Sequence, residues 1–193
     1  MNADSPTQQK TPRTQPKIPR TIWVLVGAAF IIALGYGLIA PVLPQFAGSF
    51  GVSMAAAGAV ISIFAFARLI GAPGAGRLVD RLGSRPIYLT GLLIVAASTF
   101  FVAFAQAYWQ ILALRFIAGF GSTMFTLSAQ ALIVRVTHPS IRGRANALYA
   151  SAFLVGNVVG PIIGAALSFL GFRAPFVIYG IAVAGAAVAV GAL

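Results

Sequence analysis

Apolar residues form six long runs along almost the whole chain, separated by short polar stretches. The runs lie at about 22–42, 54–74, 87–105, 109–134, 145–170 and 174–193. A helix needs about 20 mostly apolar residues to cross roughly 30 Å of hydrocarbon, and each run comes close to or exceeds that length. The pattern predicts an all-α integral membrane protein, a bundle of six transmembrane helices.

The two ends of the chain differ from the runs between them. Residues 1–20 are rich in Gln, Thr, Pro, Lys and Arg, a composition that predicts a disordered tail. The run after it is too long for a signal-peptide core and lacks a convincing cleavage site, so it is expected to be the first helix. The predicted domains are therefore a tail at 1–20 and a bundle at 21–193. The sixth run reaches the last residue without a polar flank, which indicates a bundle truncated at the end of helix six.

The composition supports a membrane protein and excludes several other classes. Hydrophobic residues make up 60% of the chain and charged residues 8%, whereas a soluble domain carries about 25% charged residues. The net charge of +11 does not indicate nucleic-acid binding, because the bases separate apolar runs instead of covering a soluble surface. With no Cys and a single His, His138, we expect no metal site and no cofactor.

The basic residues lie almost entirely on one side of the predicted membrane. Ten of them fall in the tail, the second-to-third loop and the fourth-to-fifth loop, while Arg173 stands alone on the other side. The ten are Lys10, Arg13, Lys17, Arg20, Arg77, Arg81, Arg85, Arg135, Arg142 and Arg144. The positive-inside rule then predicts a cytoplasmic N-terminus in a multi-pass protein of the plasma membrane.

The segment 76–86, GRLVDRLGSRP, follows the second run and contains the only acid outside the tail, Asp80. It resembles the signature G-x-L-a-D-R-x-G-R-R/K of the major facilitator superfamily, found between helices two and three. Ser84 replaces the first base of the final pair. The matching residues are Gly76, Leu78, Asp80, Arg81, Gly83 and Arg85.

The residue types of this segment fit a tight connection between two helices. Gly76 and Gly83 are expected to let the backbone turn tightly. The resemblance implies that Asp80, Arg81 and Arg85 belong to a cytoplasmic gating loop, which latches the two halves of a family member together in the outward-facing state. The alternative is a basic cytoplasmic loop with one incidental acid.

The fifth run contains GNVVGPIIGA at 156–165, which is similar to the superfamily's antiporter signature G-x-x-x-G-P-x-x-G-G, with Ala165 in place of the last Gly. Glycines four residues apart let neighbouring helices approach closely. Pro161 removes a backbone hydrogen bond and is expected to bend the helix. Gly156, Gly160, Pro161 and Gly164 are therefore the predicted helix-five hinge; ordinary Gly and Pro packing is the alternative.

Two arginines lie within predicted helices. Arg115, followed by Gly119 and Gly121, looks like the superfamily's intramembrane Arg of helix four, which is tied to proton coupling in related antiporters. A charge in hydrocarbon costs about 2.5 kcal/mol or more, so Arg115 is expected to face the bundle interior or a wet cavity; snorkelling to the outer interface is the alternative. Arg68 lies about two turns above the cytoplasmic loop, and we expect a snorkelling or structural role for it.

The resemblance covers about residues 20–193 and implies one half of a major-facilitator fold, an inverted three-plus-three repeat. It implies secondary active transport of a small solute by alternating access, and the antiporter signature favours proton-coupled efflux. Tyr36, Arg115 and Gln130 are the candidate residues of the substrate or proton pathway. The expected partners are a small-molecule substrate, protons, the lipid bilayer and a second six-helix half, which is either a missing C-terminal half or another copy of the chain. No acid lies within the six runs, so this half offers no proton-carrying carboxylate.

Two other functions compete with transport. An intramembrane serine protease needs a Ser nucleophile and a His base in adjacent helices, but His138 lies in a loop beside Pro139, so we expect no enzyme. A non-transporting half-transporter, or an assembly partner that needs a second bundle, remains the alternative, because one half alone cannot enclose an alternating-access cavity.

Overall fold

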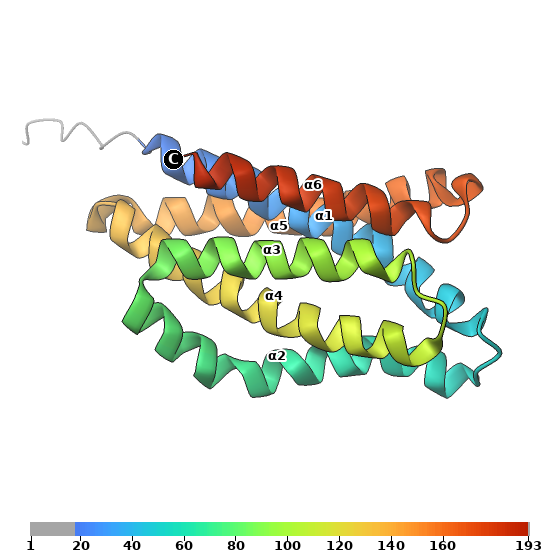
Figure 1. Ribbon diagram of the computed structural model, residues 1–193. Helices are drawn as coiled ribbons and strands as arrows, with labels where there is room; N and C mark the ends of the chain where they lie inside the picture. Colours follow the sequence, from blue (N-terminus) through green and yellow to red (C-terminus); the bar gives the residue numbers. More distant parts are fainter. Residues whose placement is uncertain (1–17, 193) are drawn as a thin grey trace, which may run out of the picture.

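The computed structural model describes residues 18–192 and consists of six long helices that run alternately up and down (Figure 1). No strand occurs in that range, and all six helices are long and apolar enough to cross a membrane. The predicted six-helix membrane bundle is confirmed. The helices are α1 (Arg20–Gly48), α2 (Met54–Leu82), α3 (Ser84–Val102), α4 (Tyr108–Val136), α5 (Arg142–Ala166) and α6 (Ala174–Gly191), with 3₁₀ turns η1 (Pro139–Ile141) and η2 (Ser168–Leu170).

Several helices extend beyond the predicted apolar runs. Most of the predicted tail, residues 1–17, lies outside the described residues, but α1 already begins at Arg20. It continues through Pro41 and Pro44, and α2 continues eight residues past Gly74. At 1.5 Å per residue, the 29 residues of α2 are about 43 Å long, more than the hydrocarbon thickness. Polar residues at helix ends can therefore remain helical outside the apolar layer.

The predicted extent of the loop between the second and third helices was wrong. The segment 76–82 forms the last two turns of α2, and α3 starts at Ser84, so Gly83 is the only residue between the two helices. Gly83 has φ 90° and ψ 157°, a conformation that is essentially restricted to glycine. Gly76 lies inside α2 and has no positive φ. Gly83 alone makes the turn, which corrects the role expected for Gly76.

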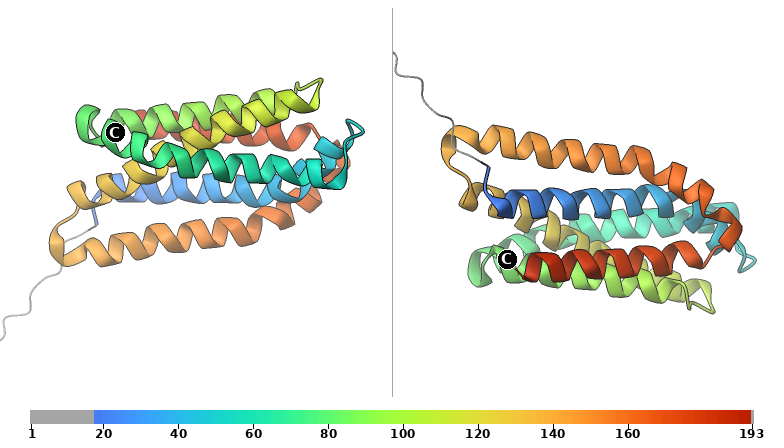
Figure 2. Two further views of the ribbon diagram at one scale, coloured as in Figure 1. Left: turned by 90° about the horizontal axis from the view of Figure 1, so that it is seen from below. Right: turned by 90° about the horizontal axis from the view of Figure 1, so that it is seen from above.

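The helix packing repeats itself in inverted order. The main neighbours are α1 with α5, α2 with α4, α3 with α4, α1 with α6, and α3 with α6. Exchanging α1 with α4, α2 with α5 and α3 with α6 turns the α1–α5 pair into α4–α2, and the α3–α4 pair into α6–α1. The α3–α6 pair stays the same under this exchange. Figure 2 shows α5 lying along α1 at one edge of the bundle. This arrangement confirms the inverted three-plus-three repeat.

Glycines lie where the two outer helices touch the central ones. A Cβ atom on Gly156 would stand 2.7 Å from the Phe30 carbonyl oxygen of α1, and one on Gly164 would stand 2.9 Å from that of Leu38. In the equivalent contact, a Cβ on Gly119 of α4 would stand 2.7 Å from the Phe64 oxygen of α2. The close approach expected of the helix-five glycines is therefore present. Helix α5 continues through Pro161 without interruption.

The faces of α2 and α5 that are turned away from these contacts are the most exposed in the bundle. Only 28% of the apolar window of α2 and 22% of that of α5 are buried, compared with 44% or more for the other four helices. The central helices α1 and α4 bring most of the polar side chains described below into the interior.

Candidate functional site

Arg115 lies inside the bundle. Helix α4 places its side chain against α3, where Nη2 donates a hydrogen bond to Thr99 Oγ1 over 3.0 Å. The guanidinium carbon lies 5.5 Å from the centre of the Phe64 ring of α2, within the range of a cation–π interaction. Arg115 is 5% exposed, so the predicted interior orientation is found and the snorkelling alternative is wrong.

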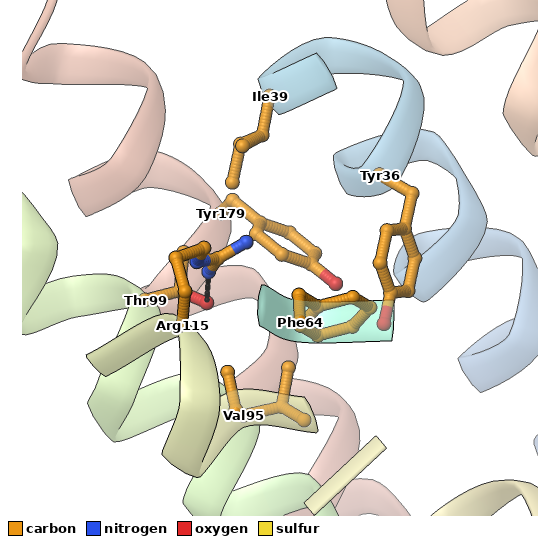
Figure 3. A pocket seen from close by; sticks show the side chains of 8 residues that line it. Tyr36, Ile39, Phe64, Val95, Thr99, Arg115 and Tyr179 are labelled. Carbon is orange, nitrogen blue, oxygen red and sulfur yellow. Dashed lines mark hydrogen bonds between the residues drawn. The ribbon is translucent and has the colours of Figure 1, made fainter. Parts of the chain in front are cut away.

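A small cavity adjoins Arg115 and is lined from α1, α2, α3, α4 and α6 (Figure 3). Its free volume of ≈ 10 Å³ is about that of a single water molecule. Besides Arg115 and Thr99, two tyrosines line it, Tyr36 and Tyr179, and in the view of Figure 3 Tyr179 lies between Arg115 and Tyr36. The Arg115 Nε is buried and has no hydrogen-bond partner in residues 18–192.

Hydroxyl groups connect the helices around this cavity. The Tyr36 hydroxyl lies 2.8 Å from Ser122 Oγ and joins α1 to α4. The Tyr179 hydroxyl of α6 donates to the Ile32 carbonyl oxygen of α1 over 3.2 Å. These polar groups are therefore satisfied within the protein at a depth where water is scarce. Sequence reasoning missed Thr99, Ser122 and Tyr179, because only the fold brings them beside Arg115.

The charge of this region is positive and is not balanced within the described chain. The sequence has only two acids, Asp4 and Asp80, and Asp4 lies outside the described residues. Asp80 is in the last turn of α2, exposed at the end of the bundle. Within residues 18–192 there is also no group of three or more metal-ligating side chains. Arg115 therefore has hydroxyl and aromatic partners but no carboxylate.

Tyr36 also borders a second, open space. This groove lies between α1, α2 and α5, has a volume of ≈ 390 Å³ and includes Arg68 and Asn157. Arg68 is exposed and lies 14 residues from either end of α2, almost four turns from Leu82. The expectation that Arg68 stands two turns above the loop was wrong, because α2 continues to Leu82, while the snorkelling or structural role expected for Arg68 stays a prediction.

Gln130 does not lie near the Arg115 cluster. It is exposed on α4, 15 residues beyond Arg115, which is about 22 Å along the helix axis. The structure therefore brings two of the three candidate pathway residues, Tyr36 and Arg115, to one cavity and separates the third from them.

The charged residues of the 76–86 segment do not form a cluster of ion pairs. Asp80 and Arg81 are exposed, and within the described chain the Asp80 carboxylate has no partner within 4.0 Å. Arg85 instead crosses to α6, where its Nη2 donates to the Gly191 carbonyl oxygen over 2.9 Å. That contact joins residues 106 positions apart and could not be read from the sequence. A cation at this carbonyl also complements the C-terminal end of the α6 dipole.

His138 lies at the turn between α4 and α5, as the sequence predicted. Its ring Nδ1 lies 2.9 Å from Ser140 Oγ and accepts from the Ser140 amide, so the side chain caps η1. The imidazole is exposed at the end of the bundle, remote from the buried cavity.

Comparison with known sequences identifies a family that matches almost the whole chain. The sequence pattern of the Major Facilitator Superfamily matches residues 25–193. The multidrug resistance protein MdtG of Escherichia fergusonii is 34% identical over 167 residues, covering 84% of this chain. MdtG of Salmonella arizonae is 34% identical over 165 residues, covering 83%. The chain spans 41% of the length of each of these relatives.

Solved structures with the same arrangement of helices are also transporters. A peptide transporter POT in complex with sulfate superposes with a TM-score of 0.83 at 16% identity, over 93% of this chain and 39% of the transporter. The human organic anion transporter MFSD10 (TETRAN) superposes with a TM-score of 0.74 at 23% identity, over 90% of this chain and 47% of the transporter. At these identities the likeness shows the fold, a six-helix half of such a transporter.

Proposed function

Because this chain belongs to the major facilitator superfamily, we propose that it forms one half of a transporter that moves a small solute across a membrane by alternating access. The solute passes between this bundle and a second six-helix half. The relatives named multidrug resistance proteins support efflux of drug-like compounds as the direction and substrate class.

The observation that carries this proposal is the buried Arg115. Its guanidinium is permanently charged, and because a charge within a membrane-crossing bundle is costly, such residues mark substrate or ion pathways. The described chain surrounds it with Thr99, Phe64 and a cavity of about one water, and leaves its Nε without a partner. A charged group with spare hydrogen-bonding capacity can exchange partners as the transporter changes state.

The exposed faces of α2 and α5 support a second half as the partner. Both helices are apolar enough to cross the membrane, and both lie beside the open groove. The concentration of basic residues at the Arg20 end of the bundle supports a cytoplasmic N-terminus in the plasma membrane.

Proton coupling belongs to the same proposal. The described membrane helices contain no acid other than Asp80, which lies at the end of α2. The proton-carrying carboxylate is therefore expected on the second half, where it would approach the open face of this bundle.

The test is efflux of the cationic dye ethidium and the anionic dye fluorescein from cells that express the intact gene product, with Arg115→Ala and Arg115→Lys as variants. We expect Arg115→Ala to abolish efflux and Arg115→Lys to retain a fraction, because lysine keeps the charge but not the planar guanidinium. Arg135→Gln, which removes an exposed charge in the last turn of α4, is the matched control.

Membrane levels and thermal unfolding of each variant show whether the bundle still inserts and folds. Full efflux by well-inserted Arg115→Ala would contradict the role of Arg115. A wild-type protein that exports nothing would favour the non-transporting half.

A further inference from the structure

Arg68 is a charge at the centre of a membrane-crossing helix. It stands 14 residues from Met54 and 14 from Leu82, about 21 Å from either end of α2. Half of the hydrocarbon thickness is only about 15 Å, but even that exceeds the length of an arginine side chain, so a guanidinium carried at mid-depth cannot snorkel to either interface. An exposed charge at this depth must face a wet space or an opposite charge.

The contacts of Arg68 place it level with the middle of two other helices. Its carbonyl oxygen accepts a hydrogen bond of 3.1 Å from Thr123 Oγ1 of α4. The neighbouring Ser122, at the midpoint of α4, lies 2.8 Å from the Tyr36 hydroxyl of α1. Arg68 and Tyr36 therefore border the groove at mid-depth, where transporters of this architecture bind their solutes.

The groove has the size and the side chains of a small-molecule site. Its volume of ≈ 390 Å³ lies within the usual range of ligand pockets, about 300–1,000 Å³. Tyr36 and Phe153 give it aromatic walls from α1 and α5, and Asn157 gives it an amide. The Asn157 Nδ2 donates to the Phe153 carbonyl over 3.0 Å, which leaves Oδ1 and one N–H without a partner in the described chain.

The charge of the groove is positive only. Within residues 18–192 the Arg68 guanidinium has no hydrogen bond and no ion pair, and no acid lines the groove. Asp80 lies on the same helix but 12 residues away, about 18 Å along the axis. Any charge that balances Arg68 must therefore come from outside the described chain.

We propose that Arg68 binds an anionic group of the transported solute, a carboxylate or a similar oxyanion, while the aromatic walls of the groove hold the solute's apolar body. This proposal rests on the proposed transport function and assigns its substrate class. A guanidinium presents two parallel N–H donors that match the two oxygens of a carboxylate, and such bidentate pairs are strong and specific. Asn157 of α5 supplies a further N–H donor to the same groove.

The first experiment measures binding. The chain is purified into lipid nanodiscs, and fluorescence anisotropy follows the anionic dye fluorescein and the cationic dye ethidium. We expect Arg68→Gln to weaken fluorescein binding about tenfold, the loss of one charge-assisted pair, without weakening ethidium binding. Arg68→Lys should retain part of the affinity, and the control Arg135→Gln should retain all of it. Equal fluorescein affinity in the wild type and in Arg68→Gln, or no binding by either, would overturn the proposal.

The second experiment measures efflux of the same two dyes by the intact gene product. Selective loss of fluorescein efflux in Arg68→Gln supports binding of a solute anion. An equal loss for both dyes would show that Arg68 pairs with an acid of the second half, which overturns the proposal while leaving transport intact. A wild-type protein that binds fluorescein but exports neither dye would reject the proposed transport and keep the anion site.

Discussion

Gly37 of α1 and Gly160 of α5 face each other so closely that a Cβ atom on Gly160 would stand 2.7 Å from the Gly37 Cα. A Cβ on Gly37 would in turn stand 2.6 Å from the Pro161 Cδ. The absence of side chains at both positions therefore sets the distance between α1 and α5 beside the open groove.

Replacing Gly160 with alanine should destabilise the bundle. The added methyl group meets backbone atoms of α1, which cannot move aside as a side chain could, and overpacking of this kind costs about 1–3 kcal/mol. Thermal unfolding of purified Gly160→Ala in detergent should show a lower midpoint than the wild type. Gly185→Ala is the control, because a Cβ on this exposed α6 glycine meets no atom within 4 Å. Equal midpoints for the two variants would contradict the packing argument.

The two glycines of the 76–86 segment should respond differently to alanine. Gly83 holds φ 90° between α2 and α3, and forcing a side chain into that region costs about 1–3 kcal/mol. Gly76 lies within α2, and a Cβ there meets no atom within 4 Å. Gly83→Ala should therefore lower the unfolding midpoint, whereas Gly76→Ala should leave it unchanged or raise it slightly. A lower midpoint in Gly76→Ala would restore a turning role for that residue.

The hydroxyl pair Tyr36–Ser122 should contribute modestly to stability. Hydrogen bonds between membrane helices are worth about 0.6 kcal/mol on average. Tyr36→Phe and Ser122→Ala each remove one hydroxyl of the 2.8 Å contact, and the double variant completes a cycle. The free energies of unfolding should show a coupling of that size, and additive effects would mean that the two hydroxyls do not interact.

Asp80→Asn should alter the balance between inward-facing and outward-facing states only in the intact transporter. The carboxylate is exposed and unpaired within residues 18–192, so its partner in a latch would have to lie on the second half. Cysteine accessibility from each side of the membrane should change in Asp80→Asn and stay near the wild-type pattern in Asp80→Glu. Identical labelling in all three proteins would indicate that the charges at this end of α2 affect topology alone.

Local sequence patterns predicted the helices and the orientation of Arg115, but not the partners of these elements. The length of an apolar run decides whether a helix can cross a membrane. The cost of a charge in hydrocarbon favours an arginine side chain that points into the bundle instead of toward lipid. The ends of the helices were harder to predict from the sequence, because α2 remains helical through Arg77 and Arg81 after it leaves the apolar layer. The Arg85–Gly191 contact depends on how distant segments meet, which no local pattern specifies.

The same limit applies to Arg68, whose place was misjudged from an apolar run that ended too early. Because residues 75–82 remain helical, an error of eight residues at one end of α2 placed Arg68 two turns from the loop instead of almost four. Its neighbours in the groove come from α1 and α5, and only the packing of those helices identifies them.

The junction at Gly83 limits how the bundle can move. Since a trans peptide chain turns only about φ and ψ, two torsion angles of one residue govern the angle between α2 and α3. A rigid-body swing of α2, which carries Arg68 at its midpoint, would therefore turn those two torsions or carry α3 along. Arg85, in the first turn of α3, donates a hydrogen bond to the carbonyl of the last residue of α6, so a displacement of α3 would be transmitted to α6 as well. A rigid movement of α2 would thus reach α3 and α6 through one glycine and one hydrogen bond.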